Sequence, residues 1–251
     1  MDLRQLVMVS NLRDPIVESL CNLFDIKVSF NDPGVGHFGL ENAVLPIGTD
    51  FLEVVSPVEE NTTAGRYLDR RGGDGGYMVI IQVDDFSEVQ KTIKENNVTV
   101  VWESEHPEAR AIHLHPKQIG GSILSLDSMI PQSAWLWAGT NWENDIQQSL
   151  VDSLMGVVLQ SPKPEKLCAS WEVALGKKRA RGVDEFFIAL EKSKIKFIKE
   201  DDARGEGINA FILSTRKPDV IYKRAEERGL IKSNSIALGG TNFILSRTDN
   251  I

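Results

Sequence analysis

HLHPKQIGGSILSL, residues 113–126, holds two of the four histidines of the chain and places a polar turn between two runs with apolar residues. The turn, residues 117–121, ends in two glycines, and strand-forming residues follow it. The pattern predicts a strand, a tight turn and a second strand. His113 and His115 share one side of the first strand, because alternate side chains of a strand point to opposite faces. By themselves, the two histidines suggest a metal centre or an acid–base pair.

The same stretch closes a larger pattern that starts at Tyr77, in which one strand and one helix are followed by three strands. An equivalent pattern occupies residues 1–57, and shorter versions start at Met155 and Ile208. Internal repetition of one supersecondary unit determines the fold class. The sequence therefore predicts an α+β protein of tandem βαβββ units, with curled mixed or antiparallel sheets and helices on the outer face.

The four units predict two domains joined by a linker. The first domain comprises residues 1–130, the linker 131–149, and an abbreviated second domain 150–251. The linker contains three tryptophans, Trp135, Trp137 and Trp142. They either lie flat against the sheet and seal the joint between the halves, or form the aromatic wall of a ligand pocket or a dimer contact.

Composition narrows the classes of partner. The chain has 251 residues, 41% of them hydrophobic and 25% charged, a net charge of -8 and a pI of about 5.1. No basic stripe argues for nucleic acid, since the one basic cluster, residues 177–181, fits a solvated turn after a helix. No apolar run reaches the ~18 residues of a membrane span, and the N-terminus lacks the layout of a signal peptide. Two cysteines without metal-type spacing, Cys21 and Cys168, predict reduced thiols and a cytoplasmic protein.

The repeated βαβββ unit resembles the vicinal oxygen chelate superfamily, which includes glyoxalase I, bleomycin-resistance proteins, extradiol dioxygenases and methylmalonyl-CoA epimerase. Three stretches are similar to the epimerase branch: HLHPKQIGGSILSL, AGRYLDRRGGDGGYMVI at 64–80 and FLEVVSP at 51–57. The resemblance covers residues 1–127 well and 150–251 more weakly. It implies a glyoxalase-like fold, but the superfamily hosts many chemistries, so it does not fix the substrate.

The resemblance also implies a divalent metal, held by residues of the first and last strand of each unit. In this chain those positions carry Arg4 (or Gln5, if the register shifts by one residue), Glu53, Met78 and Ser125. Of these, only Glu53 is a usual ligand, because arginine cannot ligate a metal and methionine is a soft, weak donor. The usual metal set is thus incomplete, and no cofactor is expected, although a divalent metal remains an open alternative.

Other roles remain open for these side chains. Arg4 and Glu53 form either a metal-free site for an anion or carbonyl group, or a plain salt bridge. His113 and His115 either join Glu53 as metal ligands or act as acid and base. Alternatively, His115 holds the turn through a ring hydrogen bond and His113 is a polar residue of the cavity or its rim.

Arg66 lies in the link between the first two units, which the resemblance places near the cavity mouth. It either receives an acidic or phosphorylated substrate or belongs to a solvated loop. Trp135 and Trp137 complete the set of candidate ligand-binding residues.

Three functions remain possible. The first is a glyoxalase-like protein that binds a small carbonyl, carboxylate or aromatic ligand in the first-domain cavity, with the usual metal site mostly lost. The second is a metal-dependent lyase, epimerase (an isomerase) or dioxygenase that uses Glu53 with His113 or His115. The third is a degenerate domain kept for protein–protein interaction. Either a monomer or a homodimer fits the pattern.

Overall fold

The first half of the chain contains most of the predicted strands, and the two predicted helices follow the first strand of each unit. The computed structural model describes residues 1–247, apart from the side chain of Glu105, so residues 248–251 at the end of the predicted second domain lie outside the described residues. The elements of the first half are β1 (Asp2–Val9), α1 (Arg13–Phe24), η1 (Pro33–Phe38), β2 (Leu40–Ile47), β3 (Asp50–Pro57), α2 (Thr63–Arg71), β4 (Gly75–Gln82), α3 (Phe86–Glu95), β5 (Val100–His106), β6 (Ala109–Leu114), α4 (Pro116–Ile119) and β7 (Ile123–Met129).

Two short 3-10 helices follow β7 and lead into the second half. The elements here are η2 (Leu136–Ala138), η3 (Trp142–Asp145), β8 (Ser153–Ser161), α5 (Pro164–Leu175), β9 (Arg179–Arg181), β10 (Phe186–Ala189), β11 (Lys194–Lys199), β12 (Gly207–Thr215), α6 (Pro218–Glu226), β13 (Ile231–Lys232), β14 (Ser235–Leu238) and β15 (Thr241–Arg247).

Strand pairing has the same form in all four units. The first strand of each unit pairs in parallel with the last: β1 with β3, β4 with β7, β8 with β11 and β12 with β15. The units are joined in pairs by antiparallel contacts, β1 with β4 and β8 with β12. The two halves of the sheet are linked by a single pair, Ile208 with Gly76. The predicted α+β class with a mixed sheet is confirmed.

Three local predictions need correction. The first unit was predicted to have three strands after its helix, but the first of them, at residues 27–30, is reduced to one bridge between Phe30 and Val44. The basic cluster is not a turn, since residues 179–181 form β9 and two of its arginines lie over the ring of Phe186. The link that carries Arg66 is the helix α2, because Thr62 accepts a hydrogen bond from the N–H of Gly65 and caps it.

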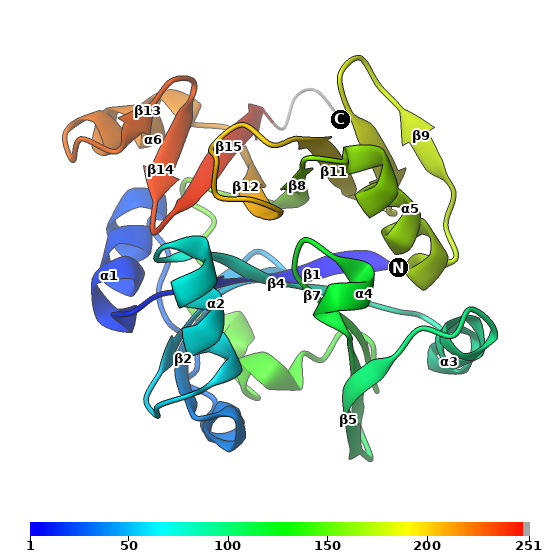
Figure 1. Cartoon of the computed structure of the whole chain (residues 1–251). Helices are drawn as coiled ribbons and strands as arrows, with labels where there is room; N and C mark the ends of the chain where they lie inside the picture. Colours follow the sequence, from blue (N-terminus) through cyan, green and yellow to red (C-terminus); the bar gives the residue numbers. More distant parts are fainter. Residues whose placement is uncertain (248–251) are drawn as a thin grey trace.

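The largest apolar core lies between the halves. It contains side chains of α1, α3, α5 and α6 and one face of each half of the sheet. Helices of the two halves meet there, α1 with α6 and α3 with α5, and Phe24 and Phe243 lie 5.2 Å apart between ring centroids. The opposite faces of the two sheet halves therefore point away from each other (Figure 1). No helix within residues 1–247 combines the length and the apolar content that a membrane crossing requires.

Candidate functional site

The outward face of the first-half sheet is covered by the chain itself. A second apolar cluster forms on this face, and it includes residues of β1, β3 and β4 together with Trp135, Ala138 and Trp142. Trp135 is fully buried and stacks on Phe51, with 6.1 Å between the ring centroids and 13° between the ring planes. Figure 1 shows this segment, in green, beneath β1 and β4. Residues 131–149 thus fill the face on which a ligand cavity was predicted.

Glu53 lies at the centre of a buried hydrogen-bond network on this face. Its two carboxylate oxygens accept from the side-chain amides of Gln5, at 2.7 Å, and Asn42, at 2.6 Å. Gln5 in turn accepts from the indole N–H of Trp135 at 2.6 Å. Burial raises the pKa of Glu53 to about 6, and the two amide hydrogen bonds oppose that rise.

A second carboxyl group holds the other candidate tryptophan. Asp127 accepts hydrogen bonds from the hydroxyl of Ser125 and, at 2.6 Å, from the indole N–H of Trp137. Ser125 and Asp127 are both buried, and burial raises the pKa of Asp127 to about 7. The serine found at an expected ligand position is therefore a partner of a neighbouring carboxyl group.

Arg4 and Gln5 both face this cluster because the pairing of β1 with β4 has a register shift between Leu3 and Gln5. Gln5, not Arg4, reaches Glu53. The guanidinium of Arg4 lies 5.5 Å from the ring centroid of Trp135, and its Nη2 donates to the carbonyl of Ser133 at 3.4 Å. Arg4 therefore contacts the linker instead of the buried carboxylate.

Met78 and His113 lie on the same side of the sheet as these residues. Met78 packs against the second cluster. His113 is opposite Ser125 in the pairing of β6 with β7, and its ring lies 4.4 Å from that of Trp102 and 6.1 Å from that of Phe38. Burial lowers the pKa of His113 to about 4, so the imidazole is neutral at pH 7.

The structure does not bring His115 or Arg66 to this face. His115 is the N-cap of α4, and its Nδ1 accepts from the N–H of Lys117 at 3.1 Å. The side chain of Arg66 is exposed on α2 and bonds to Asn61 and Thr63 of the same turn.

The residues around Glu53 do not fit a divalent metal. Both of its oxygens face amide N–H groups, which are donors and cannot ligate. Within residues 1–247, no three His, Cys, Asp or Glu side chains cluster as a metal site requires.

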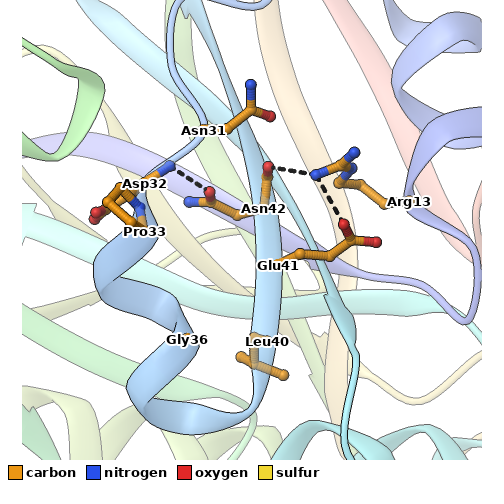
Figure 2. Close-up of a pocket in the computed structure, with 8 residues that line it drawn as sticks. All are labelled: Arg13, Asn31, Asp32, Pro33, Gly36, Leu40, Glu41 and Asn42. Carbon is orange, nitrogen blue, oxygen red and sulfur yellow. Dashed lines mark hydrogen bonds and ion pairs between the residues drawn. The ribbon is translucent and has the colours of Figure 1, made fainter.

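A small pocket opens beside the network at the edge strand β2. It has a volume of about 200 Å³ and is lined by Arg13, Asn31, Asp32, Pro33, Gly36, Leu40, Glu41 and Asn42. In Figure 2, the guanidinium of Arg13 points to Glu41 and to the carbonyl of Asn42, which it contacts at 3.1 and 3.0 Å. Asn42 also accepts from the N–H of Asp32, so one side chain joins the pocket to the buried carboxylate. A larger hollow, about 630 Å³, lies beside α5 in the second half and is lined by none of the predicted site residues.

Two residues of the network were not singled out from the sequence. Asn42 lies in the run LENAVLPI, where a polar side chain shares the parity of Val44. Asp127 lies two residues after Ser125 and so on the same face of β7. In both cases the signal was a polar residue on the face opposite the apolar core.

Comparison with solved structures places the architecture among known ones. A hypothetical protein from Staphylococcus aureus aligns with a TM-score of 0.67 and 9% identity, over 98% of each chain. A variant of 4-hydroxymandelate synthase from Streptomyces coelicolor aligns with a TM-score of 0.66 and 14% identity, over 91% of this chain and 75% of that one. Methylmalonyl-CoA epimerase from Mycobacterium tuberculosis covers 55% of this chain and 91% of its own at 19% identity, but its TM-score of 0.46 is too low to add weight. No family model and no curated protein matches the sequence.

Proposed function

We propose that the chain, which has the fold of the vicinal oxygen chelate superfamily, binds a small organic ligand beside Glu53 without a metal at that residue. The ligand carries a carbonyl, carboxylate or aromatic group. A cytoplasmic location and a monomeric or dimeric state are part of the same proposal.

The observation that carries the proposal is the connection of Asn42 to both the pocket and Glu53. The Asn42 side chain accepts from Asp32 at 2.7 Å on the pocket side and donates to Glu53 at 2.6 Å on the buried side. A ligand in the pocket that hydrogen-bonds Asn42 would compete with these contacts. Its binding would therefore change the environment of a carboxyl group whose pKa is about 6.

The test is a ligand screen followed by variants. Thermal unfolding is measured with 2-oxoaldehydes, acyl-CoAs, catechols and aromatic acids. A true ligand raises the unfolding midpoint of the natural protein, and its affinity falls at least tenfold in Asn42→Ala. Glu18→Gln, on the exposed face of α1, serves as the control and keeps full affinity.

Metal analysis tests the second half of the proposal. Protein purified without chelator, then loaded with Zn²⁺, Mn²⁺, Mg²⁺ or Fe²⁺, is expected to hold far less than one equivalent. A stoichiometric ion that disappears in Glu53→Gln would overturn this and support the metal-dependent alternative.

One observation favours the interaction hypothesis instead. Trp135 is fully buried on the face where a ligand cavity was predicted, so the linker occupies it. The degenerate-domain hypothesis replaces ligand binding if no compound of the screen raises the midpoint of thermal unfolding and a partner protein binds to the first half of the chain.

A further inference from the structure

The outward face of the second-half sheet differs from that of the first. Its floor is a small apolar cluster of Val158, Ala210 and Ile212, with Met155 and Ile198 packed around it. The surrounding side chains are open to solvent, since Met155 and Ile198 are only half-buried and Ile244, on the same face, is 37% exposed. In the first half, the equivalent face is covered by Trp135 and the rest of the linker.

Register shifts establish which positions of the two halves correspond. In the first half, the shift in the pairing of β1 with β4 leaves Arg4, the third residue of β1, without a partner. In the second half, the shift in the pairing of β8 with β12 does the same to Met155, the third residue of β8. Counting from these residues, Val7 corresponds to Val158.

The correspondence places a lysine where the first half has its buried carboxylate. Val7 pairs with Glu53, and Val158 pairs with Lys196. The charge at this position of the face is therefore reversed between the halves, from negative in the first to positive in the second.

Lys196 lies beside the apolar floor and forms an ion pair at the edge of this face. Its ammonium group contacts Glu185 at 2.9 Å, and each of these side chains is 26% exposed. An ammonium group has three donors, and Glu185 is the one partner of Lys196 that the described residues show. Lys194 points to the same face, with its Nζ 6.0 Å from the ring centroid of Phe187, so the charged side chains of β10 and β11 on this face include two cations and the adjoining Glu185.

We propose that this open face is a second binding site, which takes a small carboxylate with a flat apolar body, and that Lys196 binds the carboxylate. The N–H groups of Lys196 that do not face Glu185 would donate to the carboxylate oxygens, and the ring of Phe187 with the apolar floor would cover the body of the ligand. The site does not depend on Glu53 or on the pocket beside Asn42.

The experiment uses benzoate as the probe and benzamide as its uncharged analogue. Titration of the full chain is followed by amide chemical shifts in ¹⁵N-labelled protein. Benzoate is expected to shift amides of β8, β10 and β11 with saturation, and benzamide to bind at least tenfold more weakly. Lys196→Met, which keeps most of the stem, is expected to weaken benzoate binding at least tenfold.

Two further variants separate this role from a structural one. Glu185→Gln releases the ammonium group from its partner, so benzoate should bind several-fold more tightly. Lys199→Met removes a lysine from the same strand but from the opposite parity, and binding should not change.

Several outcomes would overturn the proposal: unchanged affinity in Lys196→Met, weaker binding in Glu185→Gln, or no saturable binding of benzoate at millimolar concentration. Shifts confined to residues 1–130 would also reject the second site, while supporting the site beside Glu53. If no compound binds in a way that depends on Asn42, but benzoate still binds through Lys196, only the proposed site beside Glu53 would be rejected.

Discussion

At the scale of single residues, Glu53 shows how a carboxylate can be buried without a neighbouring cation. Gln5 and Asn42 each present an amide N–H to it, and their own oxygens are fixed by Trp135 and by the N–H of Asp32. Neither amide can flip without losing that second contact. The network therefore specifies an acceptor at residue 53.

Glu53→Gln should consequently destabilise the protein, although it preserves size. The new amide NH₂ would face an N–H donor and leave a buried polar group unsatisfied, which costs about 1–3 kcal/mol. Urea denaturation measures the free energy of unfolding, with Glu18→Gln as the exposed control. Equal stability of the two variants would contradict the proposed rigidity of the amides.

Asp127 predicts a pH dependence of stability. Its pKa rises from 3.8 to about 7 in the folded protein, so the folded state holds a proton that the unfolded state releases between these values. The free energy of unfolding should then fall as the pH rises from about 4 to about 7. Asp127→Asn removes this pH dependence. As the pH rises from about 4 to about 7, the free energy of unfolding of the variant should therefore increase relative to that of the natural protein, by up to roughly 1.4 kcal/mol per pH unit.

Thermal unfolding of both proteins at several pH values between 4 and 8 checks this. Asp69→Asn, on the exposed face of α2, is the control and should keep the natural profile. A stability difference between Asp127→Asn and the natural protein that does not change with pH would contradict the assigned protonation.

The sequence led to several of these residues but not to their partners. Alternation along the strands and the resemblance to a family singled out Glu53, Ser125 and Gln5. The partners depend on contacts between separate elements, such as Trp137 with Asp127. Alternation and motif patterns do not reveal which linker residue contacts which strand. The shift that turns both Arg4 and Gln5 to one face is likewise a property of strand pairing.

At the scale of elements, the turn after β6 also packs against the second half of the chain, which the sequence pattern did not predict. Gly120 and Gly121 have φ angles of +80° and +76°, as the turn requires. They also contact the second half: a Cβ on Gly120 would lie 2.7 Å from the side chain of Leu167. Moreover, Trp171 of α5 donates to the carbonyl of Gly120 at 3.1 Å.

Gly120→Ala should therefore cost more than a turn glycine alone would explain. Both the left-handed backbone and the contact with Leu167 oppose a side chain, and a loss of about 2 kcal/mol or more is expected. Gly205→Ala is the control, because its φ of +79° is close to that of Gly120 and no described atom lies within 4 Å of the added Cβ. Chemical denaturation compares the two, and an equal loss would mean that docking against α5 contributes nothing.

The units themselves were accessible from the sequence because strand and helix periods differ and repeat four times. The short strands were not. β9 has three residues and β13 has two, so neither is long enough to show an alternating pattern, and β9 is highly charged. Pairing with a longer neighbour stabilises them, which is a tertiary effect.

At the scale of the whole molecule, one arginine from each half forms hydrogen bonds with backbone carbonyls of the other half. Arg71 of α2 donates to the carbonyls of Arg204 and Gly205, each at 2.7 Å. Arg204 donates in return to the carbonyls of Arg71, Gly73 and Asp74 in the first half, and also to that of Gly240 in its own half. Together with the shared apolar core, this junction predicts that both halves unfold in one cooperative transition.

Arg204→Lys tests the junction directly. A lysine keeps the charge, but its single ammonium group cannot span four carbonyls as the planar guanidinium does. The carbonyls left without partners should lower the free energy of unfolding by about 1–3 kcal/mol. The two halves should still unfold together, because the apolar core between them remains. Calorimetry of the full chain measures both effects. Arg228→Lys is the control, because within residues 1–247 the side chain of Arg228 is bonded to the carbonyl of Arg224 in the preceding helix α6 and to no residue of the first half. Two separate transitions in Arg204→Lys would instead mean that the arginines, and not the shared core, hold the halves together.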